Sequence, residues 1–165
     1  MDFIIIFAAK YLFLISIVVY LVFSFVLWLN NIHTFKYFFI LSLLSFLLIT
    51  IVGKILSFVI VDPRPFVVEN IPPLIDHAVD NGFPSAYTLI TTAIASIIFA
   101  YNKPLGIILF VIALLVGIAR VFAYIIHPVD IFGAALIGVI ITTFVFLILT
   151  LHSMYNDEPL KPRMR

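Results

Sequence analysis

Long apolar segments decide what this chain of 165 residues can fold into. A helix needs about 20 apolar residues to cross a bilayer. A segment that crosses lipid must be helical, because only a helix pairs its own backbone polar groups there. Five stretches meet or approach this requirement: residues 3–28, 37–61, 85–101, 105–126 and 129–151. The sequence therefore predicts an all-α integral membrane protein built as a five-helix transmembrane bundle.

The composition supports this class and excludes others. Hydrophobic residues make up 65% of the chain, charged residues make up 10%, and the mean hydropathy is +1.31, far from the values of soluble domains. The absence of cysteine excludes disulfides and thiolate metal sites. A net charge of +1 does not indicate a nucleic-acid partner. Membrane lipids are the expected surroundings.

The domain organisation follows from the apolar segments. We predict a single transmembrane domain over residues 1–152 and a basic tail over residues 153–165. The N-terminus lacks the basic start and small-residue cleavage site of a signal peptide. We expect it to form part of the first helix, and the sequence leaves open an extra interfacial helix at this end.

The connection over residues 62–84 differs from the others in length and composition. It is rich in proline and acidic residues, which indicates a surface loop. It also exceeds the ~12–15 residues that structureless loops usually reach, which favours a functional role such as a lid.

The charges predict an orientation in the plasma membrane. Alternating crossings place the long loop, with Asp62, Glu69, Asp76 and Asp80, on one side. The opposite side carries basic residues of the short turns and the tail: Lys36, Lys103, Lys161, Arg163 and Arg165. Short loops rich in lysine and arginine stay cytoplasmic. We therefore predict a multi-pass protein with its tail inside and its long loop outside.

Polar residues stand at the outer ends of the predicted helices: Lys54, Arg64, Ser85, Arg120 and Asp130. Charges at a membrane edge are costly, and each one is a candidate functional residue. The planar fork of an arginine matches phosphate oxygens, and a helix that begins at Ser85 would offer free N–H groups to an anion. Each residue also has an ordinary alternative role: snorkelling for Lys54, pairing with Asp130 for Arg120, a loop position for Arg64 and a cap for Ser85. Because antiparallel packing brings them to one end, we predict a phosphate pocket formed by Lys54, Arg64, Ser85 and Arg120.

Three motifs carry a resemblance to a known family. They are Lys54 with D-P-R-P-F at 62–66, F-P-S-A-Y-T at 83–88, and A-R-V-F-A-Y-I-I-H-P-V-D at 119–130. In this order they resemble the type 2 phosphatidic acid phosphatase superfamily, which includes undecaprenyl-diphosphate phosphatases. The resemblance implies hydrolysis of a lipid phosphate or pyrophosphate at the outer leaflet, with neither metal nor cofactor.

Two positions depart from the family's pattern. Where the family has an acid histidine in the second motif and a nucleophilic histidine in the third, this chain has Tyr87 and Ile126. His127 follows one place late and could pair with Asp130 at i,i+3, which makes these two residues the candidate catalytic pair. His77 in the outer loop is a second candidate acid. His33 and His152 fall at the opposite side and have no expected role.

Two functions remain open at this point. The first is a lipid phosphatase in which Arg64 and Arg120 hold phosphate and His127 is the nucleophile. The alternative is a non-catalytic pseudophosphatase that binds lipid phosphates or a membrane partner. Retention of the basic residues suits both functions. The loss of the two histidines favours the second function on mechanism, whereas the family resemblance favours the first.

Overall fold

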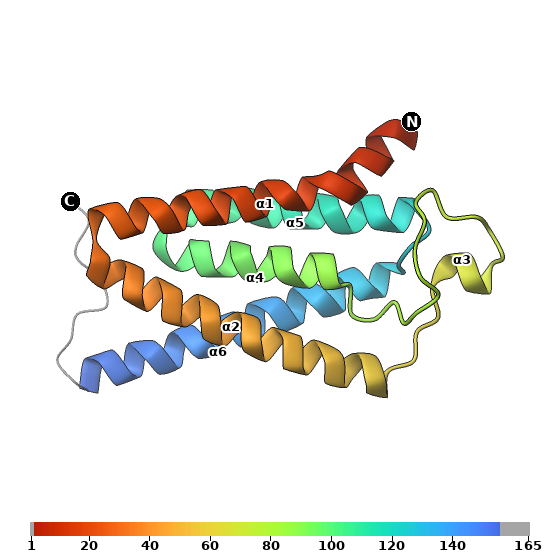
Figure 1. Ribbon diagram of the computed structural model, residues 1–165. Coiled ribbons are helices and arrows are strands. Elements are labelled where there is room, and N and C mark those ends of the chain that lie inside the picture. The colour runs from red at the N-terminus through yellow and green to blue at the C-terminus, as the bar shows by residue number, and fades with distance from the viewer. Residues whose placement is uncertain (1, 156–165) are drawn as a thin grey trace.

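A computed structural model describes residues 2–155 as a bundle of long helices (Figure 1). The elements are α1 (Asp2–Asn30), α2 (Ile32–Val59), α3 (Pro65–Val68), α4 (Ala86–Tyr101), α5 (Lys103–Phe122) and α6 (Pro128–Tyr155). Over these residues, α1, α2, α5 and α6 are long and apolar enough to cross a membrane. Helix α4 is apolar but shorter, with 16 residues. The chain is thus an all-α, multi-pass membrane protein.

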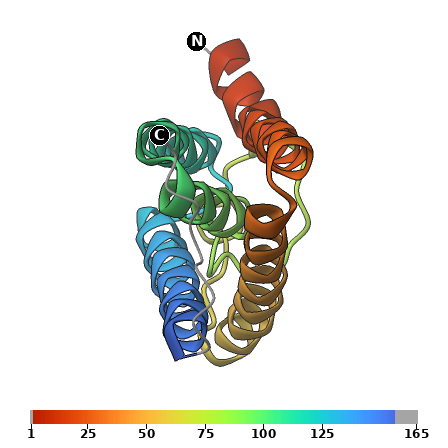
Figure 2. The ribbon, with the colours of Figure 1, turned by 90° about the vertical axis from the view of Figure 1, so that its left-hand side faces the viewer.

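Helix α4 lies at the centre of the bundle and packs against α1, α2, α5 and α6 (Figure 2). More than half of its residues are buried. At about 1.5 Å per residue it extends roughly 24 Å, less than the ~30 Å hydrocarbon core of a bilayer. Its short length is tolerated because protein surrounds the helix. Because α4 is short, its first turn lies below the rim of the bundle (Figure 1).

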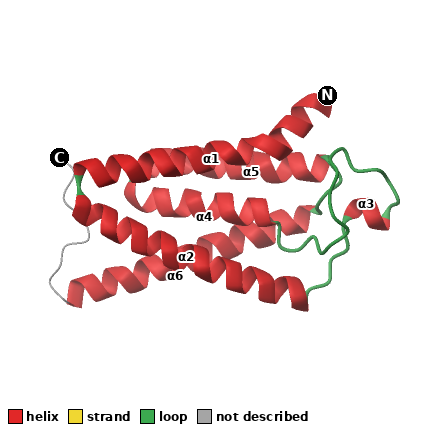
Figure 3. Ribbon diagram, viewed as in Figure 1, coloured by secondary structure: helices red, strands yellow, loops and turns green. Residues whose placement is uncertain are grey.

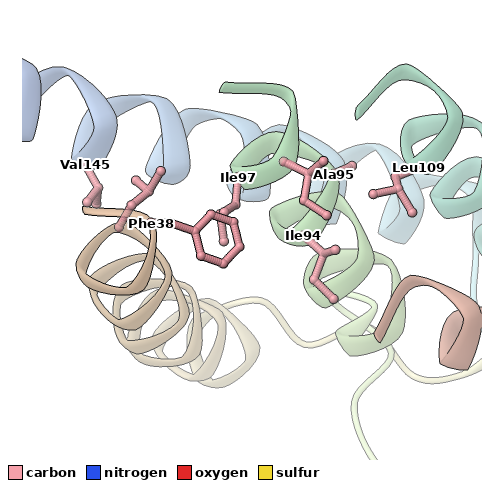
Figure 4. Close-up of a cluster of buried hydrophobic side chains, with 8 residues drawn as sticks. Phe38, Ile94, Ala95, Ile97, Leu109 and Val145 are labelled. Atoms are coloured by element: carbon pink, nitrogen blue, oxygen red, sulfur yellow. The ribbon is translucent and has the colours of Figure 1, made fainter. Parts of the chain in front are cut away.

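The buried residues of the main core come from α2, α4, α5 and α6 (Figure 4). Phe38 of α2, Ile97 of α4, Leu109 of α5 and Val145 of α6 are at most 3% exposed. The outer surface is also apolar, and Phe58 is 89% exposed. In a soluble protein such a surface would drive aggregation, whereas a bilayer solvates it.

Gly106 permits a close approach between α4 and α5. A Cβ atom added at Gly106 would lie 2.5 Å from the Cα of Phe99, so α4 and α5 touch backbone to backbone. We expect Gly106→Ala to lower the free energy of unfolding by about 2–3 kcal/mol, because the obstructing atoms belong to backbone and cannot move aside. Unfolding of the purified protein in mixed detergent would measure this. The neighbouring Ile107→Ala, on the exposed face of α5, is the control, and equal stability of both variants would contradict the prediction.

Several helix ends differ from the sequence-based boundaries. Helix α2 begins at Ile32 instead of 37, because Asn31 caps it by accepting a hydrogen bond from the Thr34 N–H at 2.9 Å. Helix α5 ends at Phe122 instead of 126. Tyr124 adopts a positive φ of 60°, and its carbonyl accepts from the Phe66 N–H of the outer loop at 3.3 Å. These backbone bonds to the loop compete with continuation of the helix.

The two chain ends also differ from expectation. Helix α1 is continuous from Asp2, so the extra interfacial helix does not form as a separate element in the described residues, although the first turns lean away from the bundle (Figure 1). Helix α6 continues to Tyr155, so the first residues of the predicted tail are helical. The rest of that tail, 156–165, lies outside the described residues.

The long connection between α2 and α4 folds over one end of the bundle (Figure 3). Its short helix α3 was not predicted. Asn81 fastens the connection, donating from Nδ2 to the carbonyl oxygens of Ser57 and Ile60, each at 2.6 Å. Its Oδ1 accepts from the Asp62 N–H at 2.7 Å. These bonds satisfy carbonyls at the end of α2 and hold the loop against the helix ends.

Candidate functional site

A cavity of about 420 Å³ opens at the end of the bundle that the long loop covers. Its polar lining comes from four separate parts of the chain. Lys54 comes from the last turns of α2, Arg64 and His77 from the loop, Ser85 and Tyr87 from the start of α4, and Arg120 from the last turn of α5. Apolar residues that include Ile49, Leu89, Ile90 and Ile126 complete the walls.

Arg64 is buried and its donors are largely occupied. Its Nε donates to Asp80 Oδ1 at 2.7 Å, Nη1 to the Ile125 carbonyl at 2.9 Å, and Nη2 to the Asn81 carbonyl at 3.3 Å. Arg64 therefore ties the loop to the end of α5 while it presents positive charge to the cavity.

The charge of Asp80 depends on Arg64. Burial raises the pKa of Asp80, but the hydrogen bond and charge of Arg64 outweigh burial and hold the pKa below its usual value. A carboxylate with a lowered pKa stabilises the fold above its ordinary pKa and loses this contribution as the pH falls through the lowered value. The pair therefore stays ionised near neutral pH.

Arg120 is equally buried, at 5% exposed, but has donors to spare. Its Nη2 donates to His77 Nε2 at 3.2 Å, and its guanidinium lies 4.0 Å from the centre of the Tyr87 ring. Tyr87 is held in turn by an edge-to-face contact with Phe13 of α1, with ring centroids 4.6 Å apart. In the described part of the chain, Arg120 Nε has no hydrogen-bond partner. A buried cation with free donors is suited to bind an anion.

The start of α4 adds a second anion-binding feature. Ser85 is the N-cap, is 2% exposed, and pairs through Oγ with Thr88 Oγ1 at 3.0 Å. Ala86 and Tyr87, which form the first turn, line the cavity. The first N–H groups of a helix have no partner within the helix and carry its positive dipole end. Lys54 approaches the same cavity with a largely exposed side chain.

The structure brings some predicted site residues together and separates others. Lys54, Arg64, Ser85 and Arg120 line one cavity, together with Tyr87 and Ile126 at the altered motif positions. His127 and Asp130 are not among the residues that line it.

His127 and Asp130 face a different neighbour. The ring Nδ1 of His127 lies 3.2 Å from Asp62 Oδ1, and Asp130 Oδ2 accepts from the backbone N–H of His127 at 2.7 Å. The expected ring pairing with Asp130 is replaced by this backbone contact. His127 stands one residue after the family's histidine position, near the start of α6. At this position its imidazole is directed toward Asp62.

Within residues 2–155, one group of side chains has the geometry to hold a metal ion. One ligand atom each of Asp62, His127 and Asp130 lies within 4.8 Å of the other two. The group lies beside the cavity instead of in its lining. Asp62 also has a structural role in the loop, since its backbone N–H donates to Asn81.

Sequence reasoning missed part of the site. The sequence predicts Asp80 only as an acidic residue of the outer loop and His77 as a candidate acid there, and it does not single out Asn81. All three line the cavity. The unusual length of the loop was the signal available, and it did not indicate which loop residues fold inward.

Comparisons with known proteins agree with the motifs. A family model described as the PAP2 superfamily matches residues 38–153. The chain is 34% identical over 122 residues to the bacitracin transport permease protein BcrC of Bacillus licheniformis, over 73% of this chain and 60% of that protein. It is 33% identical over 91 residues to the undecaprenyl-diphosphatase BcrC of Bacillus subtilis strain 168, over 55% of this chain and 47% of that protein. The matches thus span less than two thirds of each relative.

Two solved structures share the fold. The crystal structure of Aquifex aeolicus LpxE matches with a TM-score of 0.67 and 24% identity, over 89% of this chain and 87% of that chain. A transmembrane PAP2 type phosphatidylglycerolphosphate phosphatase from Bacillus subtilis matches with a TM-score of 0.58 and 23% identity, over 99% of this chain and 87% of that chain. At this level of identity the likeness concerns the arrangement of helices.

Proposed function

The chain belongs to the PAP2 superfamily, and from this premise we propose that it is a lipid-phosphatase-like membrane protein. Its cavity receives the phosphate or diphosphate of an undecaprenyl-diphosphate or phosphatidate type lipid. The observation that carries this proposal is the convergence of Lys54, Arg64 and Arg120 on one cavity beside the first turn of α4.

Lys54, Arg64 and Arg120 differ in how much charge and how many hydrogen-bond donors they can offer to a phosphate. Arg64 is already paired with Asp80, so it contributes mainly a fixed, preorganised wall. Arg120 and Lys54 supply the charge that Asp80 does not neutralise. A phosphate group carries a charge of about −1.5 to −2 at pH 7, which two free cations and a helix N-terminus balance. Ser85 adds a buried hydroxyl at the same end of the cavity.

The apolar walls suit the lipid part of the ligand. Ile49 of α2 and Leu89 and Ile90 of α4 line the cavity next to the polar end. A lipid phosphate can thus place its head group among the arginines while its first carbons contact these side chains.

The membrane arrangement follows from the same proposal. The shorter helix α4 crosses the plasma membrane together with α1, α2, α5 and α6, and the cavity opens on the outer side. The support is the charge distribution: Lys36 and Lys103 lie at the end opposite the acidic loop. By the positive-inside tendency, the end with these lysines is cytoplasmic.

A non-catalytic binder is the second candidate, and a specific observation favours it. Tyr87 and Ile126, the residues at the family's two histidine positions, both line the cavity. An isoleucine cannot attack phosphorus, and a phenol is a much weaker acid than an imidazolium. If only these two positions are considered, the cavity can still bind a lipid phosphate but cannot hydrolyse it.

The proposal is tested by the response of the purified protein to phosphate mimics. Orthovanadate at about 100 times its Kd should stabilise the fold by about 2.7 kcal/mol. For a chain of this size that is a rise in Tm of about 5–10 °C. Chloride at equal ionic strength is the control, and equal shifts from both salts would refute the phosphate pocket. Phosphate release from undecaprenyl diphosphate and phosphatidic acid then separates the phosphatase from the binder.

A further inference from the structure

One of the chain's four histidines lines the phosphate cavity: His77, from the long outer loop. The loop path brings His77 against Arg120 of α5 and next to Asp80, whose carboxylate holds Arg64. Its side chain is 22% exposed, so it is partly sheltered but remains accessible from the cavity. The cavity therefore contains an imidazole although both motif histidines are absent.

The hydrogen bonds of His77 fix which ring nitrogen is free to react. Arg120 has only donors to offer, so its contact with Nε2 at 3.2 Å makes Nε2 the acceptor with the lone pair. Nδ1 then carries the proton, 3.3 Å from the Ala78 carbonyl and 3.7 Å from Asp80 Oδ1. The Ala78 carbonyl thus holds Nδ1–H, with the Asp80 carboxylate close by, and the lone pair of Nε2 lies at the cavity beside Arg120. A nucleophile held in place by a hydrogen-bonding partner is what nucleophilic catalysis requires.

The electrostatic surroundings keep this ring neutral. Burial lowers the pKa of His77, and the charges of Arg64 and Arg120 lower it further, against the opposing effects of the Ala78 carbonyl and the Asp80 carboxylate. The imidazole is therefore unprotonated at pH 7, and Nε2 keeps its electron pair. A bound phosphate would take over the Arg120 donor and release Nε2 from its present hydrogen bond.

Resting on the proposed function, we propose that His77 is the nucleophile of this site and that its substrates are lipid diphosphates. The Nε2 electron pair forms a bond to the terminal phosphorus while the bond from that phosphorus to the bridging oxygen breaks. The lipid monophosphate leaves with the bonding electrons. Water then attacks the phosphohistidine, the P–N bond returns its pair to Nε2, and both protons of the water leave with inorganic phosphate.

The leaving group explains why the substrate is a diphosphate. A lipid monophosphate is a stable anion, with a second pKa near ~6, and leaves without receiving a proton. A phosphomonoester would have to expel an alkoxide, which needs a general acid. Tyr87 stands at the family's acid position, but its ring is packed between Phe13 and the Arg120 guanidinium. The cavity thus has a nucleophile and phosphate-binding groups but lacks an efficient acid.

The test compares His77→Gln with His33→Gln, a matched change on the exposed first turn of α2 at the opposite end of the bundle. The substrates are farnesyl diphosphate and farnesyl monophosphate, which share one tail. We expect the wild type and His33→Gln to release phosphate from the diphosphate at least 100-fold faster than from the monophosphate. His77→Gln should lower diphosphate turnover by about 10³-fold or more yet keep the Tm shift with orthovanadate. Diphosphate labelled in its terminal phosphate should leave acid-labile label on the wild type and on His33→Gln, but not on His77→Gln.

Specific results would overturn the inference. Turnover by His77→Gln equal to that of His33→Gln would remove His77 as nucleophile, and loss of turnover in His127→Gln alone would transfer the role to His127. Equal rates on the two substrates would overturn the diphosphate restriction. A wild type that binds orthovanadate without any turnover would refute this inference and leave phosphate binding intact. A wild type that does not bind orthovanadate would refute the proposed function itself.

Discussion

Replacing Arg120 by alanine is expected to abolish the stabilisation of the protein by orthovanadate and to weaken phosphate binding by about 100-fold or more. Truncating one partner of a buried, hydrogen-bonded charge pair costs about 2–5 kcal/mol. Arg120 meets the conditions for this range, because it is 5% exposed and its Nε is free to bind a ligand. The measurement is the rise in Tm across an orthovanadate titration of the purified variant.

The variant itself should remain folded, which makes the result interpretable. The contacts of Arg120 are to His77 and the face of Tyr87. Arg64, in contrast, ties residues 80–81 of the loop to the Ile125 carbonyl beyond α5. Arg120→Lys keeps the charge but loses the planar fork, and should retain part of the affinity. Lys103→Ala, which removes one positive charge at the other end of the bundle, is the matched control. A full orthovanadate response from Arg120→Ala would remove Arg120 from the pocket.

The sequence predicted the helices and the end of the bundle at which the polar residues meet, for a simple reason. Membrane crossings alternate in direction, so a residue's place along its helix fixes the side on which it lies. Lys54 near the end of α2, Ser85 before α4 and Arg120 near the end of α5 had to share one end. The lining of the cavity agrees with that argument.

The remaining features depended on the path of the loop, which no periodicity encodes. His77 faces Arg120 because Arg64 and Asn81 draw residues 80–82 back over the helix ends. The early end of α5 has the same origin, since the carbonyls of Tyr124 and Ile125 bind loop donors instead of continuing the helix. Such contacts join residues about 60 positions apart, as between Arg64 and Ile125. Local propensity cannot anticipate contacts of this kind.

The same loop geometry changes how the motif departures are interpreted. From sequence, His127 was the natural substitute for the residue at 126, because it is adjacent and near Asp130. In the structure, the two neighbouring side chains point to different places. Ile126 lines the cavity, whereas the ring of His127 lies against Asp62. His77, although distant in sequence, therefore reaches the cavity through the folded loop, whereas His127, the neighbour of Ile126, does not line it.

Restoring histidine at both altered positions, as Tyr87→His with Ile126→His, is expected to create phosphatidic acid hydrolysis. Both native side chains line the cavity, so both imidazoles would be placed beside the bound phosphate. A positioned general acid contributes about 10²–10⁴-fold, and that is the gain we expect over the wild type on this monoester. Inorganic phosphate release from phosphatidic acid in detergent micelles is the measurement.

The two single variants identify which histidine is responsible for the gain. Tyr87→His supplies only the acid, so monoester hydrolysis by this variant alone requires a nucleophile that the wild type already has, the role we propose for His77. Ile126→His supplies a nucleophile without the acid, and we expect little monoester turnover from it. It should also be less stable, because Ile126 is 1% exposed and belongs to a buried apolar cluster with Ile75 and Ala119. A polar ring at such a position costs about 1–3 kcal/mol. If the double variant binds orthovanadate but stays inactive, positions 87 and 126 do not reach the reacting phosphorus, and the reaction must be assigned to other residues.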